Sequence, residues 1–154
     1  MRFRPIEARD AEWVVRWRNA NRDSFFDNRV VTTDTHLEFM RNRRLHDLIW
    51  IVEDEGVPVG MAGLRVDVEH CIAEYRMLLV GDEHKGKGYG EQIEREVMKY
   101  AFDVLKLDYL WGDYLESNKA IGKLHEKTGW TIEGIDLPGH THERGRVVHI
   151  GYHK

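Results

Sequence analysis

The sequence predicts an α/β domain whose strands form a mixed, mainly antiparallel sheet of about six or seven strands, flanked by about four helices. Short apolar runs bounded by Gly, Asp or Pro predict strands, and apolar residues at helical spacing predict helices between them. A third observation is the glycine-rich segment His84–Gly90, which stands where a strand passes into an amphipathic helix. Helices and strands therefore alternate along one chain.

The first half of the chain predicts strands at 2–4, 48–52, 57–67 and 71–80, the last returning antiparallel. A first helix is expected at Ala8–Arg22, with Trp17 on its apolar face. Thr35–Glu38 has the form of a capping box, so a second helix is expected to run to about Arg44.

The second half predicts a helix that follows the glycine-rich segment and ends near Leu105. A strand at Leu107–Tyr114 and a helix at Ser117–Lys127 come next, and Gly129 should close that helix in a left-handed conformation. A final hairpin is expected from the strands 130–142 and 147–152.

Length and composition predict one domain over residues 1–154. The net charge of −4 does not favour bulk nucleic-acid binding. No apolar run has the length of a bilayer span, and the N-terminus has no apolar signal core. Cys71 is the only cysteine, so no internal disulfide is possible, and we expect it to be a buried, inert thiol. A cytoplasmic protein is the simplest expectation.

The segment His84–Gly90 has the composition of a phosphate-binding loop. Glycines let backbone N–H groups approach an anion, and a helix N-terminus adds partial positive charge. Gly86, Gly88 and Gly90 are evenly spaced and do not fit the dinucleotide fingerprint, while the Walker loop would need a Ser or Thr after its Gly-Lys pair. The pattern therefore predicts a pyrophosphate loop without a metal ligand.

Two segments resemble the GNAT superfamily of acyl-CoA-dependent N-acetyltransferases. Lys85–Gly90 resembles the family loop Arg/Gln-x-x-Gly-x-Gly/Ala, with lysine in the first position. Glu116–Gly134 resembles a second family segment, which begins a helix with Asn and ends in aromatic-Glu-Lys-x-Gly-aromatic. The resemblance extends over nearly the whole chain and is weaker in its N-terminal third.

This resemblance implies acetyl-CoA as co-substrate and no metal. The loop Lys85, Gly86, Lys87, Gly88, Tyr89 and Gly90 would hold its phosphates. Leu78, Leu79 and Val80 would pair with the pantetheine arm through their backbone. Asn118 would contact the amides of that arm, although its position also suits a helix N-cap.

The transfer needs a proton acceptor for the amine and a proton donor for the departing thiolate. Glu74 is the candidate base, expected on the same strand face as Leu78; an ion pair with Arg76 or Arg65 is the alternative. His125 stands where the family often has a proton-donating tyrosine, so it is the candidate acid or a structural hydrogen-bonding residue. Tyr114 and Tyr89 are substitutes for that role.

The acceptor pocket is expected in the N-terminal third. There the chain resembles the branch that acetylates amino groups of nucleotide-linked sugars and that shades into protein N-terminal acetyltransferases. Arg18 or Arg22 is expected to bind a diphosphate and Trp17 or Trp50 to stack on a sugar or base, with Asn19 and His36 as further acceptor residues. The alternatives are a core position for Trp17 and a solvated surface for the arginines. Protein N-terminal or lysine acetylation and non-catalytic acyl-CoA sensing are the alternatives.

Several histidines gather near the C-terminus: His140, His142, His149 and His153. No carboxylate accompanies them at a metal-site spacing, so we expect no metal. They are expected to line the acceptor pocket or a homodimer contact.

Overall fold

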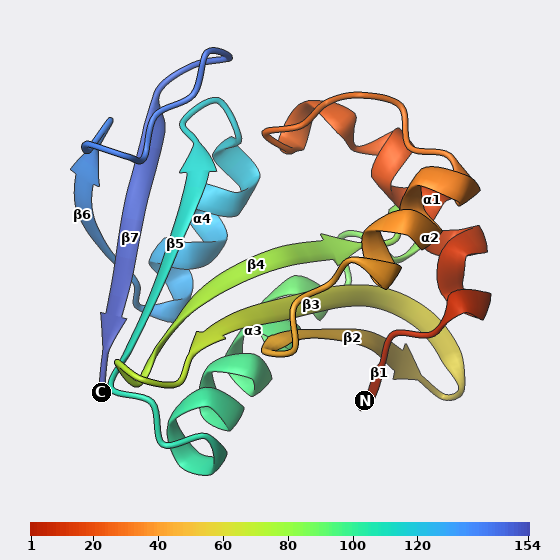
Figure 1. Ribbon diagram of the computed structural model, residues 1–154, viewed down its shortest axis with the longest axis horizontal. Helices are drawn as coiled ribbons and strands as arrows, with labels where there is room; N and C mark the ends of the chain where they lie inside the picture. Colours follow the sequence, from red (N-terminus) through yellow and green to blue (C-terminus); the bar gives the residue numbers. More distant parts are fainter.

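The computed structural model describes residues 1–154 and contains one seven-stranded sheet (Figure 1). The strand order is β1-β2-β3-β4-β5-β7-β6, and every neighbouring pair is antiparallel except β4 with β5. The strands are β1 Arg2–Pro5, β2 Asp47–Asp54, β3 Val57–Asp67, β4 Ile72–Val80, β5 Tyr109–Leu115, β6 Thr131–Ile135 and β7 Val147–His153. The predicted mixed, mainly antiparallel sheet is confirmed.

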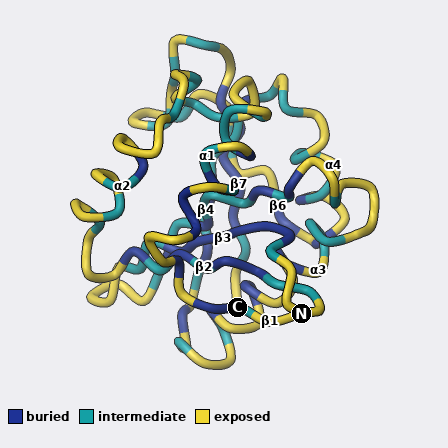
Figure 2. The backbone as a smooth tube through the Cα atoms, turned by 90° about the vertical axis from the view of Figure 1, so that its right-hand side faces the viewer, coloured by how far each residue is buried: buried dark blue, intermediate teal, exposed yellow.

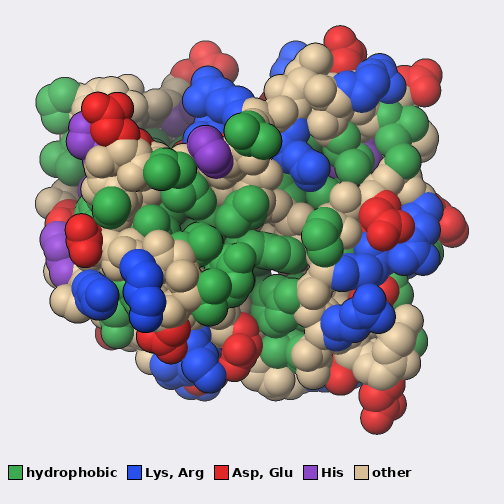
Figure 3. Space-filling model, turned by 60° about the horizontal axis from the view of Figure 1, so that its bottom comes forward, with side chains coloured by type: hydrophobic (Ala, Val, Ile, Leu, Met, Phe, Trp, Pro, Cys, Tyr) green, Lys and Arg blue, Asp and Glu red, His purple; other side chains and the backbone are tan.

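Four α-helices cover this sheet: α1 Ala11–Ala20, α2 Thr33–Arg41, α3 Tyr89–Lys99 and α4 Lys119–Thr128. One apolar cluster joins α3 to β3, β4, β5 and β7, and a second joins α1 to β2, β3 and β4. The central strands are therefore buried on both faces, whereas α2 is largely exposed (Figure 2). Hydrophobic side chains also gather at the centre of the face shown in Figure 3, with charged side chains around them. None of the helices combines the length and the apolar composition that a membrane-spanning helix requires.

The sheet is divided between β4 and β5. These parallel strands pair only over Ile72–Glu74 with Tyr109–Trp111, and beyond Glu74 they separate. This separation opens a space between the two parts of the sheet, lined by the C-terminal half of β4.

Helix boundaries differ from the prediction where local hydrogen bonds favour other starts and ends. The expected first helix begins with a 3₁₀ turn, Ala8–Asp10, and a second such turn, Arg22–Ser24, follows α1. Thr32, not Thr35, caps α2: its hydroxyl accepts the Thr35 amide, and the Thr35 hydroxyl accepts the Thr32 amide in return. Helix α2 ends at Arg41, and α3 passes into a π-helical turn at Tyr100–Val104.

Two further expectations are corrected. Cys71 is exposed, with a φ of 56° in the turn between β3 and β4, so the expected burial of its thiol is wrong. The penultimate strand β6 ends at Ile135 rather than near His142. The segment between Asp136 and Arg146 forms a long loop, in which His142 and Gly145 make an isolated bridge. Pro138 and Gly139, at a φ of 80°, interrupt strand geometry there.

Candidate active site

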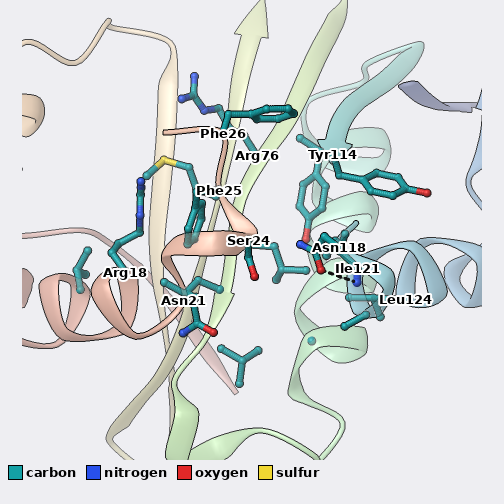
Figure 4. A pocket seen from close by; sticks show the side chains of 18 of the residues that line it. Arg18, Asn21, Ser24, Phe25, Phe26, Arg76, Tyr114, Asn118, Ile121 and Leu124 are labelled. Atoms are coloured by element: carbon teal, nitrogen blue, oxygen red, sulfur yellow. Dashed lines mark hydrogen bonds between the residues drawn. The ribbon is translucent and has the colours of Figure 1, made fainter. Parts of the chain in front are cut away.

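A cavity of about 1190 Å³ occupies the space where β4 and β5 separate. Its walls come from β4, the glycine-rich loop, α3, β5 and α4 on one side, and from α1, α2 and their connection on the other. Figure 4 shows Arg18, Phe25 and Arg76 facing Tyr114 and Asn118 across it. Residues far apart in the sequence therefore line one chamber.

A β-bulge shapes the β4 wall. Met77 and Leu78 together oppose Ala62 of β3, and Met77 has a φ of 61°. Such a bulge leaves backbone groups without a partner in the β-ladder. It also reverses which face of the sheet each later side chain occupies, compared with a regular strand. Before it, Tyr75 packs into the α3 cluster; after it, Leu78 does so, while Leu79 packs into the α1 cluster. Glu74 and Leu78 thus lie on opposite faces, which corrects the prediction that they share one.

The glycine-rich loop presents unpaired backbone donors to the cavity. Gly86 and Gly88 have φ values of 78° and 83°, which only glycine adopts readily, and Gly88 is the N-cap of α3. The amides of residues 86–90 donate to no other backbone group or side chain of the protein. Together with the helix dipole, this arrangement suits an anion such as pyrophosphate.

Side chains around the loop have unequal access to the cavity. Lys85 lines it, and its ammonium lies 2.6 Å from the Asp82 carboxylate. Lys87 does not line the cavity. Tyr89 lines it with its ring, but its hydroxyl donates to Asp54 at 2.6 Å, and this hydrogen bond, followed by burial, raises the pKa of Tyr89. Its hydroxyl is therefore tied to the end of β2.

Asn118 caps α4 from the cavity wall. Its side-chain oxygen accepts the Ile121 amide at 3.3 Å (Figure 4), and the residue lines the cavity beside Leu124. The side-chain amide nitrogen makes no hydrogen bond within the protein. Leu78, Leu79 and Val80 line the opposite wall. The expected N-cap is present, and the same side chain retains donors for a ligand.

His125 lies on α4 at the floor of the cavity, 6% exposed. Its Nδ1 is 2.9 Å from an oxygen of Glu94, a fully buried residue on α3 that also accepts the Thr128 hydroxyl. Its Nε2 has no hydrogen-bond partner. The Tyr75 and Tyr114 rings pack beside it, and burial raises the pKa of both tyrosines. No local sequence pattern identifies Glu94 as its partner, because 31 residues separate them.

Two guanidinium groups in the cavity wall make no ion pair. Arg18 stacks over the Phe25 ring at 4.0 Å, and its Nε is buried without a partner. Arg76 of β4 is half-buried, and burial lowers the pKa of both arginines. His36 also reaches the cavity; it is buried, and burial followed by the Arg18 charge lowers its pKa. Arg18 and Arg76 therefore place two positive charges without an ion-pair partner in the cavity wall.

Two predicted acceptor residues do not reach the cavity. Asn19 uses its side-chain amide to bind both the N–H and the C=O of Val31, so it joins α1 to the segment before α2. Trp50 packs edge-on against Tyr100, 5.4 Å between centroids, on the α3 face of the sheet. We therefore remove both from the acceptor site.

Glu74 lines the cavity and forms neither of the expected ion pairs, because Arg65 pairs with Asp47 at 2.8 Å instead. Its neighbour across the parallel ladder is Trp111. With no arginine bound to it, the Glu74 carboxylate is free to accept a proton or a hydrogen bond within the cavity.

Two loops in contact with each other cover one side of the cavity, and this cover, which we call the roof, was not predicted. Arg144, in the long loop after β6, donates to the backbone oxygens of Phe25 and Phe26, and His142 packs against the Phe26 ring at 5.3 Å. Phe25 and Phe26 line the cavity. More than a hundred residues separate the two loops, so no local sequence pattern reveals their contact.

The divided sheet, the bulged strand and the loop of free amides together define a transferase that binds a phosphate-bearing acyl carrier. The profile of the family described as acetyltransferase (GNAT) domain, Acetyltransf_3, matches residues 1–131, and the chain belongs to this family of N-acetyltransferases.

Individual relatives agree with this assignment. The chain is 25% identical to the acetyltransferase PseH of Campylobacter jejuni over 140 residues, 87% of this chain and 85% of that protein. It is 25% identical to the spermidine N(1)-acetyltransferase of Vibrio cholerae over 139 residues, 86% and 79% of the two chains. The structure of the V. cholerae spermidine N-acetyltransferase in complex with CoA and spermine has the same fold, with a TM-score of 0.87, 20% identity, and coverage of 99% and 94% of the two chains.

Proposed function

We propose that this N-acetyltransferase transfers the acetyl group of acetyl-CoA to the primary amine of a nucleotide-linked amino sugar by direct attack in a ternary complex. The observation that carries the acceptor class is the pair of unpaired guanidinium groups, Arg18 and Arg76, in the cavity wall. A diphosphate satisfies buried guanidinium groups through charge-assisted hydrogen bonds, whereas a polyamine would be repelled by them.

The residues around the glycine-rich loop fit the co-substrate. The free amides of residues 86–90 suit a pyrophosphate, and Lys85 adds positive charge beside it. The bulged segment of β4 and the amide of Asn118 offer hydrogen bonds to a pantetheine arm laid between β4 and β5. Acetyl-CoA supplies a thioester activated toward amines. The anion cradle and the unpaired guanidinium groups line one chamber, which suits two phosphate-bearing ligands.

Residues of the protein can carry out both proton transfers, one from the acceptor ammonium and one to the departing thiolate. Glu74 accepts the proton of the acceptor ammonium, directly or through water, because no arginine forms an ion pair with its carboxylate. His125 donates a proton to the departing thiolate from Nε2, the nitrogen left free when Nδ1 is bound to Glu94. Backbone donors at the Met77–Leu78 bulge stabilise the developing oxyanion.

The roof favours a small acceptor over a protein. Arg144 joins the loop after β6 to the segment that carries Phe25 and Phe26, so the acceptor end is bounded on that side. A protein N-terminus or a lysine would need an open groove at this position. Protein acetylation therefore remains the second candidate, and non-catalytic acyl-CoA sensing the third.

The test is acetyl-CoA-dependent thiol release with four acceptors: a nucleoside-diphosphate-linked amino sugar, the same amino sugar without the nucleotide, spermidine and an N-terminal peptide. Arg18→Gln and Arg76→Gln should each raise KM for the nucleotide-linked sugar by about 10-fold or more, since a hydrogen bond to a charged group contributes about 1.5–3 kcal/mol. Arg29→Gln is the matched control, because Arg29 lines the same cavity but is 85% exposed and paired with Asp27.

Each result decides between the candidates. Turnover of the nucleotide-linked sugar that depends on Arg18 and Arg76 supports the proposal. Faster turnover of spermidine or peptide rejects the acceptor class while keeping the enzyme. Tight CoA binding with no turnover of any amine would favour the sensor.

A further inference from the structure

Three potential metal ligands converge on the face of the sheet where β5 and β7 pair. Asp113 of β5 is the register partner of His149 of β7, and His140 reaches the same point from the loop after β6. The two Asp113 oxygens lie 2.7 Å from the Nδ1 atoms of His140 and His149, one each. The ligand atoms of all three residues lie within 4.8 Å of one another. The cluster is only partly exposed, with side-chain exposures of 11–29%.

We propose that Asp113, His140 and His149 form a binding site for a divalent transition metal, with Zn²⁺ as the first candidate. Two imidazoles and one carboxylate are a common ligand set for zinc, which binds three protein ligands and keeps one position open where it is not purely structural. Imidazole favours zinc, copper and nickel over magnesium or calcium. The site is independent of which acceptor the enzyme uses.

Small movements convert the observed hydrogen bonds into ligation. Without metal, one Asp113 carboxylate accepts an N–H from each imidazole. Two nitrogens on one tetrahedral zinc are about 3.4 Å apart, because each Zn–N bond is about 2.1 Å. Both imidazoles pack on Trp111, His140 edge-on at 5.2 Å and His149 stacked at 5.5 Å. His140 can make the adjustment, since it follows Gly139 in a loop, whereas the backbone of His149 is held in β7.

The metal would also fix the loop that roofs the cavity. His140 and Arg144 belong to the same loop, and Arg144 contacts the backbone of Phe25. Asp113 itself lines the cavity. An ion at this point would anchor the loop to β5 and β7 and place positive charge at the cavity edge.

The experiment is a calorimetric titration of chelator-treated, untagged protein with ZnCl₂ near neutral pH. One equivalent should bind, and Asp113→Asn and His149→Gln should each weaken binding by more than about 10-fold, since even indirect partners of a metal cost 10–100-fold when removed. His70→Ala is the matched control: it removes a surface histidine whose Nδ1 lies 2.8 Å from Asp67, so its loss should leave the affinity unchanged.

A second measurement guards against misfolding. Thermal unfolding with Zn²⁺ and with EDTA should show a zinc-dependent rise in Tm for the wild type and for His70→Ala, and none for Asp113→Asn or His149→Gln. Binding of less than half an equivalent overturns the site. So does zinc binding that survives Asp113→Asn and disappears with His70→Ala.

Discussion

Aspartate in place of Gly88 should weaken CoA binding by more than about 100-fold beyond what alanine does at the same position. Gly88 caps α3 at a φ of 83°, within the run of amides that have no partner in the protein. The substitution changes two things, backbone strain and local charge, and the two can be measured separately.

The Gly88→Ala substitution measures the effect of backbone strain alone. An L residue in the left-handed region costs about 1–2 kcal/mol, and an added Cβ would meet only Gln92 Nε2, at an ordinary 3.7 Å. Aspartate adds the charge. At about 5 Å from a phosphate and an effective dielectric constant of about 20, its carboxylate costs about 3 kcal/mol for each phosphate charge. That cost corresponds to more than about 100-fold in Kd.

Calorimetric titration with CoA gives the affinities, and thermal unfolding gives the stabilities. Gly56→Ala is the control for strain: Gly56 has a φ of 78°, has no atom within 4 Å of an added Cβ, and lies outside the cavity. It should lose stability as Gly88→Ala does and keep its CoA affinity. If Gly88→Asp binds CoA within about threefold of Gly88→Ala, the amides of this loop do not hold the pyrophosphate.

Other predictions concern the proton transfers and the stability of the fold. Glu74→Gln should lower kcat by about 100-fold at unchanged CoA affinity; wild-type turnover would remove Glu74 as the base. His125→Phe should lower kcat by at least about 100-fold. Glu94→Gln should shift the pH profile of kcat while retaining part of the rate, because Glu94 acts through His125; an unaltered profile would leave Glu94 a purely structural role. Arg4→Met should cost about 3–5 kcal/mol at pH 7, because Asp10 is fully buried and paired with Arg4 at 2.7 Å. Burial raises the pKa of Asp10, but hydrogen bonds, that from Arg4 first, outweigh it and hold the pKa below its ordinary value. This stabilisation is therefore complete above the unfolded-state pKa of about 3.9 and is lost as the pH falls through the lower folded-state pKa. Denaturant unfolding should show the difference between wild type and Arg4→Met shrinking over that range.

The sequence predicted the features that local chemistry determines. Apolar periodicity located the helices and strands, and the glycines of residues 86–90 predicted the turn that leads into α3, because a positive φ at Gly86 and Gly88 demands glycine there. The bulge at Met77 was not predicted, since no glycine marks it. For the same reason Glu74 was placed on the same face as Leu78, although the two lie on opposite faces. Local sequence patterns also could not predict contacts between residues that are far apart in the sequence. Asp113 meets His140 and His149 only because β5 and β7 pair, so the expectation of histidines without a carboxylate rested on spacing alone.

The short ladder between β4 and β5 also has a mechanical consequence. The arm β1–β4 and the arm β5–β7 share a β-ladder only over Ile72–Glu74, and side-chain packing around α3 and the Arg144 contact complete the connection between them. An extended ligand bound between β4 and β5 beyond Glu74 would form hydrogen bonds with the strand edges where the two strands no longer pair with each other. Amide hydrogen exchange in Arg76–Val80 and Gly112–Leu115 should therefore slow when CoA binds, while the paired residues before Glu74 change little. Binding of CoA would then be detected as slower amide exchange in β4 and β5, and not only at the loop expected to hold its phosphates.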